Sequence, residues 1–148
     1  MQNQNKNVEQ QYQTLIVLWF ALLVSQLMFL VVLFFAKREI YNFDFSKSPL
    51  GENSMIIIIF AVLGLSMFLT SFVLRKKFLD QAVAEQKPPL VQTAMIIGCA
   101  LCEAVSLIGL VLAFAFNYQY FFLWFALGIL GIILHFPRRD NLIVASYK

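Results

Sequence analysis

Long apolar stretches alternate with short polar segments along this chain. They cover about residues 14–36, 55–74, 91–116 and 119–136. Basic residues follow the first, second and fourth stretches, and Glu103 is the only acidic or basic residue within the third. An α-helix rises about 1.5 Å per residue, so about 20 residues cross a hydrocarbon layer about 30 Å thick. The pattern therefore predicts four transmembrane helices, of which the fourth is the shortest.

Basic residues and prolines mark the limits of these stretches, and helices are the structure that fits them. Lys37 and Arg38 close the first stretch, Arg75 begins the basic group after the second, and Pro88 and Pro89 precede the third. No alternation of polar and apolar residues suggests a barrel, and backbone groups in lipid must find partners within the membrane segment or bundle. We expect an all-α, polytopic membrane protein without a β-sheet.

Composition supports the same class. Apolar residues make up 61% of the 148 residues and charged residues only 13%, and the mean hydropathy is +0.78, which is far from the profile of a soluble domain. Residues 1–13 are polar and rich in Gln and Asn, and we expect them to be a retained N-terminal tail rather than a signal peptide. Residues 14–148 then form one four-helix transmembrane domain.

Basic residues predict the orientation, since Lys and Arg favour cytoplasmic loops. Eight belong to the tail, the second loop and the C-terminal segment, and three to the loop between the first two stretches. The first group is Lys6, Arg75, Lys76, Lys77, Lys87, Arg138, Arg139 and Lys148, and the second is Lys37, Arg38 and Lys47. We expect both termini in the cytoplasm of a multi-pass protein of the cell membrane, the inner membrane if the source is bacterial.

Glu103 is the candidate functional residue. It is the thirteenth of 26 residues in the third stretch, so it falls near the bilayer midplane, where a charge costs about 2.5 to 3.5 kcal/mol on insertion scales. Burial favours the neutral acid, and a carboxyl that also ionises beside a cation or a water path binds and releases protons. The alternative is that a protonated Glu103 only hydrogen-bonds to another helix. Gln26 and Ser25, near the middle of the first stretch, are candidate partners.

The third stretch also carries small residues at helical spacing. Ala94, Gly98, Cys102 and Ser106 recur every four residues, followed by Gly109. Small residues let membrane helices approach closely, so this stripe predicts a helix interface within the chain or with a copy.

Three further polar or reactive residues suggest little chemistry. Cys99 and Cys102 have the C-x-x-C spacing, but inside a membrane helix we interpret them as packing residues, with no disulfide and no metal site. His135, near the end of the fourth stretch, is either a polar residue at the membrane interface or a proton relay.

Residues 83–114 resemble a known family. Ile97-Gly98, Ala100-Leu101, Glu103-Ala104 and Gly109-Leu110-Val111, after a loop with Gln86 and Pro88, are similar to the c subunit, or proteolipid, of rotary ATP synthases. The resemblance places a proteolipid-like hairpin at about residues 55–116. It implies that Glu103 is an ion-binding carboxylate, and Ala104, where a sodium-binding member has a polar residue, favours the proton.

Two functions follow as hypotheses. The first is a proton-linked membrane protein related to proteolipids, with Glu103 as the protonation site. The second is a non-catalytic accessory or assembly subunit of a larger membrane complex. A small transporter and an enzyme fit less well, since the stretches contain few polar groups, no nucleophile with a base and no phosphate-binding loop. We expect no cofactor and no nucleic-acid partner; the expected partners are lipid, protons, and copies of the chain or other membrane subunits.

Overall fold

The computed structural model describes residues 2–42, 44, 46, 48–50 and 53–146. Within this part the chain is helical and has no strands. The elements are α1 (Gln2–Ala36), the short 3-10 helix η1 (Arg38–Tyr41), α2 (Ser54–Glu85), α3 (Pro89–Phe116), α4 (Phe121–Leu134) and α5 (Arg139–Ser146). The all-α prediction is confirmed for these residues.

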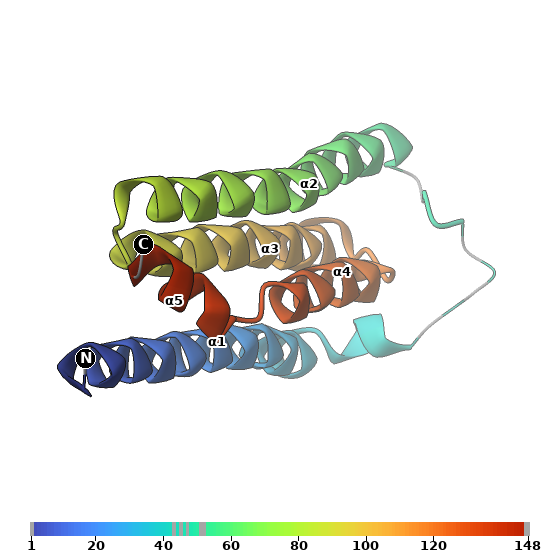
Figure 1. Cartoon of the computed structure of the whole chain (residues 1–148). Coiled ribbons are helices and arrows are strands. Elements are labelled where there is room, and N and C mark those ends of the chain that lie inside the picture. The colour runs from blue at the N-terminus through green and yellow to red at the C-terminus, as the bar shows by residue number, and fades with distance from the viewer. Residues whose placement is uncertain (1, 43, 45, 47, 51–52, 147–148) are drawn as a thin grey trace.

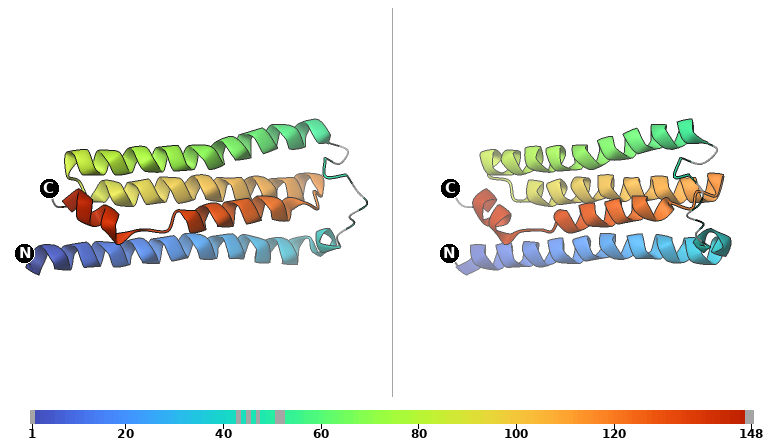
Figure 2. Two further views of the ribbon diagram at one scale, coloured as in Figure 1. Left: turned by 45° about the vertical axis from the view of Figure 1, so that its right-hand side comes forward. Right: turned by 90° about the vertical axis from the view of Figure 1, so that its right-hand side faces the viewer.

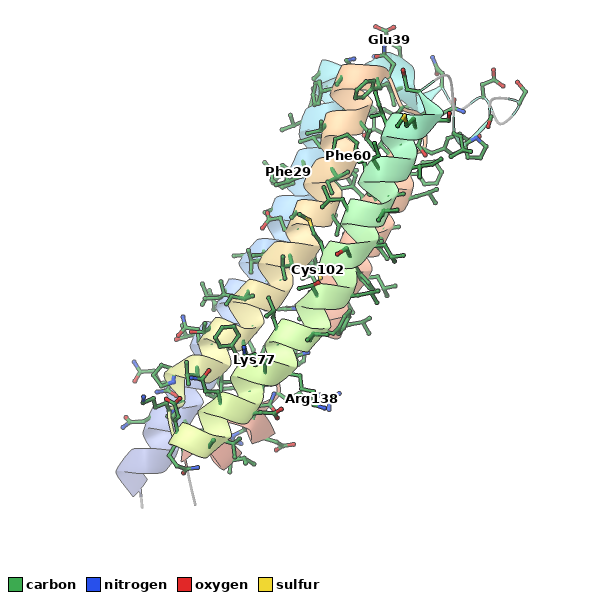
Figure 3. The ribbon with its side chains drawn as sticks, turned by 90° about the horizontal axis from the view of Figure 1, so that it is seen from above. Phe29, Glu39, Phe60, Lys77, Cys102 and Arg138 are labelled. Atoms are coloured by element: carbon green, nitrogen blue, oxygen red, sulfur yellow. The ribbon has the colours of Figure 1, made fainter. Side chains whose placement is uncertain are left out.

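The long helices lie side by side in an elongated bundle, with α3 and α4 between α1 and α2 (Figures 1 and 2). The chain ends marked N and C and the α2–α3 turn lie at one end, and η1 lies at the other. Lys77 and Arg138 therefore lie toward one end of the bundle, Glu39 toward the opposite end, and Cys102 between them (Figure 3).

Two of the predicted apolar stretches are parts of longer helices. Residues 2–13, expected as a polar tail, are helical and continuous with α1, which has 35 residues. Likewise α2 continues past the basic group at Arg75 to Glu85, for 32 residues. It ends because Gln86 adopts a left-handed conformation, with φ 52°, and two prolines follow.

The third helix is the centre of the bundle. In the most apolar part of α3, 50% of the residues are buried inside the protein, compared with 17% for α2 and 11% for α1. The α3–α4 hairpin turns at Asn117, which is left-handed with φ 49°. Lys37 closes this turn from α1, because its Nζ donates to the carbonyl of Phe114 at 2.7 Å and to Asn117 Oδ1 at 2.6 Å.

The fourth predicted span contains one short helix, α4. α4 has only 14 residues, or about 21 Å at helical rise, which is short of a hydrocarbon layer of about 30 Å. A break follows, and α5 leaves at 45° to α4. Three described helices are thus long and apolar enough to cross a membrane, or four if the bent pair of α4 and α5 is one span.

Candidate protonation site

Glu103 lies between α3 and α1 and contacts Ser25. The distance from Ser25 Oγ to Glu103 Oε1 is 2.7 Å, and both side chains are partly buried. Ser25 Oγ is also 2.7 Å from the carbonyl oxygen of Leu22, one turn earlier in α1. One serine hydroxyl thus has two close oxygen neighbours.

Because Ser25 has a single hydroxyl proton, the hydrogen bonds it can donate depend on whether Glu103 is protonated or ionised. A hydroxyl has one proton to donate, and a backbone carbonyl can only accept. If Ser25 donates to Leu22, the short contact to Glu103 is a hydrogen bond only when Glu103 is the protonated donor. If Glu103 is ionised, Ser25 must donate to it instead and gives up the bond to Leu22. A rotation of one hydroxyl therefore adapts this geometry to either form of the carboxyl.

No cation balances Glu103 within the described residues. The ion pairs there are Lys87–Glu85 at 2.6 Å and Arg139–Glu9 at 2.9 Å, and both lie on exposed surface. A carboxylate in this position would lack the partner that an ion needs in lipid.

Gln26, the other candidate partner, has a different setting. Its side chain is fully buried on the face of α1 that also buries Leu15 and Leu33. Neither Gln26 Nε2 nor Oε1 has a hydrogen-bond partner among the described residues, and a buried polar group without a partner costs about 1–3 kcal/mol. Gln26 therefore destabilises the packing on this face of α1 unless water or another molecule forms hydrogen bonds with its amide.

The small-residue stripe of α3 faces α4. A Cβ on Gly109 would come within 2.5 Å of Trp124 Cβ. In the same row, Cys102 packs on Gly131 and Ser106 packs on Gly128. A Cβ added to either glycine would overlap the side chain that packs on it. Ala94, the first member of the stripe, is also fully buried. Close helix approach along this row is thus made within the chain.

The two cysteines are buried thiols. Cys99 and Cys102 are both free and fully buried. The Cys102 thiol donates weakly to Ser71 Oγ at 3.5 Å, and Ser71 in turn donates to the Phe68 carbonyl at 2.6 Å. The described residues contain no group of three His, Cys, Asp or Glu side chains that could hold a metal ion.

His135, for which a polar interfacial residue and a proton relay are the two expectations, is fully buried within the protein. Its ring lies over Gly98 and beside Phe72, with 4.6 Å between ring centroids. Nδ1 is 2.7 Å from the Gly131 carbonyl, so Nδ1 carries a proton and donates, because a carbonyl only accepts. Nε2 then has a buried lone pair with no donor among the described residues.

Arg75 and Trp19 donate hydrogen bonds to backbone carbonyls at the end of α4. Their positions in the sequence do not suggest this role. Arg75 donates from Nη1 to the Leu134 carbonyl and from Nη2 to the Phe136 carbonyl, each at 3.0 Å. Trp19 Nε1 donates to the Ile132 carbonyl at 2.7 Å. The last carbonyls of a helix have no partner within the helix itself. These three bonds allow α4 to stop inside the bundle.

No protein-family model, curated protein or solved structure matches this chain.

Proposed function

We propose that this chain is a proton-linked membrane protein that crosses the cell membrane four times, with both termini in the cytoplasm and Glu103 as the protonation site. The observation that carries the proposal is the shared hydroxyl of Ser25, 2.7 Å from both Glu103 Oε1 and the Leu22 carbonyl. A carboxyl near the middle of a membrane helix costs free energy on insertion into the bilayer, so its presence there indicates a function or a partner.

The chemistry is the transfer of one proton. In the neutral state Glu103 donates to Ser25, and Ser25 donates to Leu22. When the carboxyl loses its proton to water or to a base on a partner, Ser25 turns and donates to the carboxylate. Because the spans offer no free cation near Glu103 in the described part of the chain, the partner supplies an arginine or a water path during ionisation.

The resemblance to proteolipids extends to Glu103 as the protonation site, and it does not extend to a ring of copies. In this chain α4 packs on the small-residue row of α3 at Cys102, Ser106 and Gly109, and His135, the residue after α4, covers Gly98. Copies of the chain would have to pack through other faces. The proposed activity is therefore protonation at Glu103 in a four-helix subunit, with proton translocation depending on its partners.

The same contact favours a second candidate function. The Ser25–Glu103 bond joins α1 to α3 within the chain, as a purely structural polar contact would. A non-catalytic accessory or assembly subunit of a membrane complex would need no more than this. The two candidates differ in whether Glu103 exchanges its proton with water.

A hydrophobic carbodiimide distinguishes them, because it reacts with protonated carboxyls in apolar surroundings. Native membranes are labelled over a range of pH, and the modified residue is identified by mass spectrometry. We expect labelling at Glu103 that fades as the pH rises, and none in Glu103→Gln. No labelling at any pH, together with normal assembly of Glu103→Gln, would refute the proton-linked function and favour the accessory subunit.

A further inference from the structure

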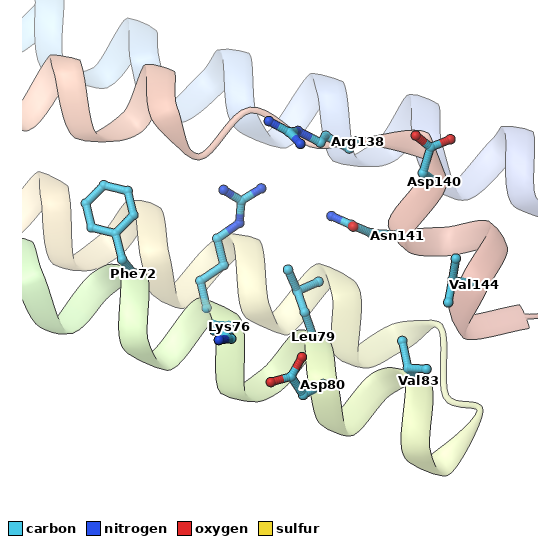
Figure 4. Close-up of a pocket in the computed structure, with 10 residues that line it drawn as sticks. Phe72, Lys76, Leu79, Asp80, Val83, Arg138, Asp140, Asn141 and Val144 are labelled. Carbon is cyan, nitrogen blue, oxygen red and sulfur yellow. The ribbon is translucent and has the colours of Figure 1, made fainter.

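The break between α4 and α5 leaves a pocket beside α2. The chain turns by 45° where a straight α4 would have continued along the bundle, and a cavity of about 480 Å³ lies between α2 and α5. One wall carries Lys76, Leu79 and Asp80 from α2, and the other carries Arg138 and Asn141 from the break and α5 (Figure 4). Arg75 also lines it.

We propose that this pocket binds the phosphate headgroup of an anionic phospholipid. Three of the lining residues are basic, namely Arg75, Lys76 and Arg138, and they come from both walls. Lys76 and Arg138 have no ion pair in the described part of the chain, where the ion pairs are at Lys87 and Arg139. Basic pockets between helices at the cytoplasmic surface are typical sites for anionic headgroups.

Arg75 can bind a phosphate and still complete the end of α4. Two of its N–H groups, one on each Nη, serve the carbonyls of Leu134 and Phe136. A guanidinium has five N–H donors, so three remain. Arginine donors arranged in a plane match phosphate oxygens well. The fold thus holds one cation of the pocket in place before any ligand arrives.

The depth and lining of the pocket favour a lipid over a soluble phosphate. The apolar run of α2 ends at Leu74, so Arg75 and Lys76 follow at headgroup level. Phe72 lines the pocket on the membrane side of these cations, where an acyl chain would leave. Leu79, Val83 and Val144 add further apolar lining. Asp80 and Asp140 are acidic lining residues, and they disfavour ligands of high negative charge.

The test uses the full chain in vesicles of equimolar phosphatidylglycerol and phosphatidylcholine. After mild detergent extraction, native mass spectrometry measures which lipid stays on the protein. We expect phosphatidylglycerol to be retained selectively. Lys76→Gln and Arg138→Gln should each weaken retention about fivefold, since a basic residue near a membrane surface contributes about 1 kcal/mol. Arg75 is left unchanged because it also supports α4.

Lys77→Gln is the matched control. Lys77 is the next residue along α2, is exposed and has the same charge, but it does not line the pocket. Equal loss in Lys77→Gln, or equal retention of phosphatidylcholine, would overturn the proposal. Titration of the delipidated protein with inorganic phosphate tests the other source. Thermal stabilisation by inorganic phosphate as large as that by the lipid would assign the pocket to soluble phosphate instead.

Discussion

The imidazole ring of His135 lies on the backbone of Gly98, so that a Cβ at position 98 would overlap its Cδ2 and lie 2.6 Å from its Nε2. This contact fixes where the break after α4 sits against α3. A glycine allows the approach because it has no side chain, and a buried aromatic ring cannot withdraw as a flexible side chain would.

Gly98→Ala should therefore destabilise the bundle by about 1–3 kcal/mol through overpacking. The measurement is the free energy of unfolding in mixed micelles. Combining it with His135→Ala removes the ring that the new methyl group meets, so the double variant should lose less than the sum of the two single losses. Additive losses would show that the two residues do not contact one another.

Arg75→Gln should destabilise the protein by about 1.5–3 kcal/mol, since hydrogen bonds to charged groups contribute this much and two carbonyls of the α4 end lose their donor. Arg75→Lys should recover only part of the loss, because a lysine is a single point of charge. Lys77→Gln is the control and should change unfolding little. A loss as large in the control would mean that general surface charge, and not the α4 end, is responsible.

Replacing Gln26 by methionine should stabilise the protein by about 1–3 kcal/mol. The change keeps most of the side-chain volume and removes two buried polar atoms that have no partner among the described residues. The readout is again unfolding in mixed micelles. A loss of stability would instead indicate that Gln26 holds a water molecule or binds another subunit.

The Ser25–Glu103 contact predicts a measurable coupling. Glu103→Gln should keep most of the stability, because the side-chain amide can donate to Ser25 as a protonated carboxyl would. A double-mutant cycle with Ser25→Ala and Glu103→Leu should give a coupling of about 0.6 kcal/mol, within the upper limit of about 1.7 kcal/mol seen for such bonds in membranes. Zero coupling would mean that the two side chains do not interact in lipid.

Cysteine labelling tests the orientation. Cys99 and Cys102 are fully buried, so an impermeant maleimide should give little background in intact cells. A cysteine at Asn53, an exposed residue before α2, should react from outside. A cysteine at the exposed Ala84, near the other end of α2, should react only after the membrane is opened. The reverse result would place the N-terminus outside, together with the C-terminus if α4 and α5 make a fourth crossing.

Several features of the candidate site could be predicted from sequence because they depend on local pattern. Glu103 is conspicuous as a carboxyl within an apolar run, and Ser25 was a candidate partner at a similar position in its own run. The helical spacing of Gly98, Cys102 and Ser106 predicts a shared face, since residues four apart lie above one another. His135 gave no such signal, because its burial depends on where α4 stops.

The sequence by itself determined the helical class, the end of α1, the start of α2, the approximate limits of α3 and the presence of one carboxyl within an apolar stretch, because hydrophobic length and composition act along the chain. Only the tertiary structure decided that α5 turns away after α4. It also decided that α4, rather than a copy, fills the small-residue row of α3. These outcomes rest on contacts between distant residues, such as Arg75 with Leu134 and Trp19 with Ile132, which supply donors to carbonyls at the end of α4.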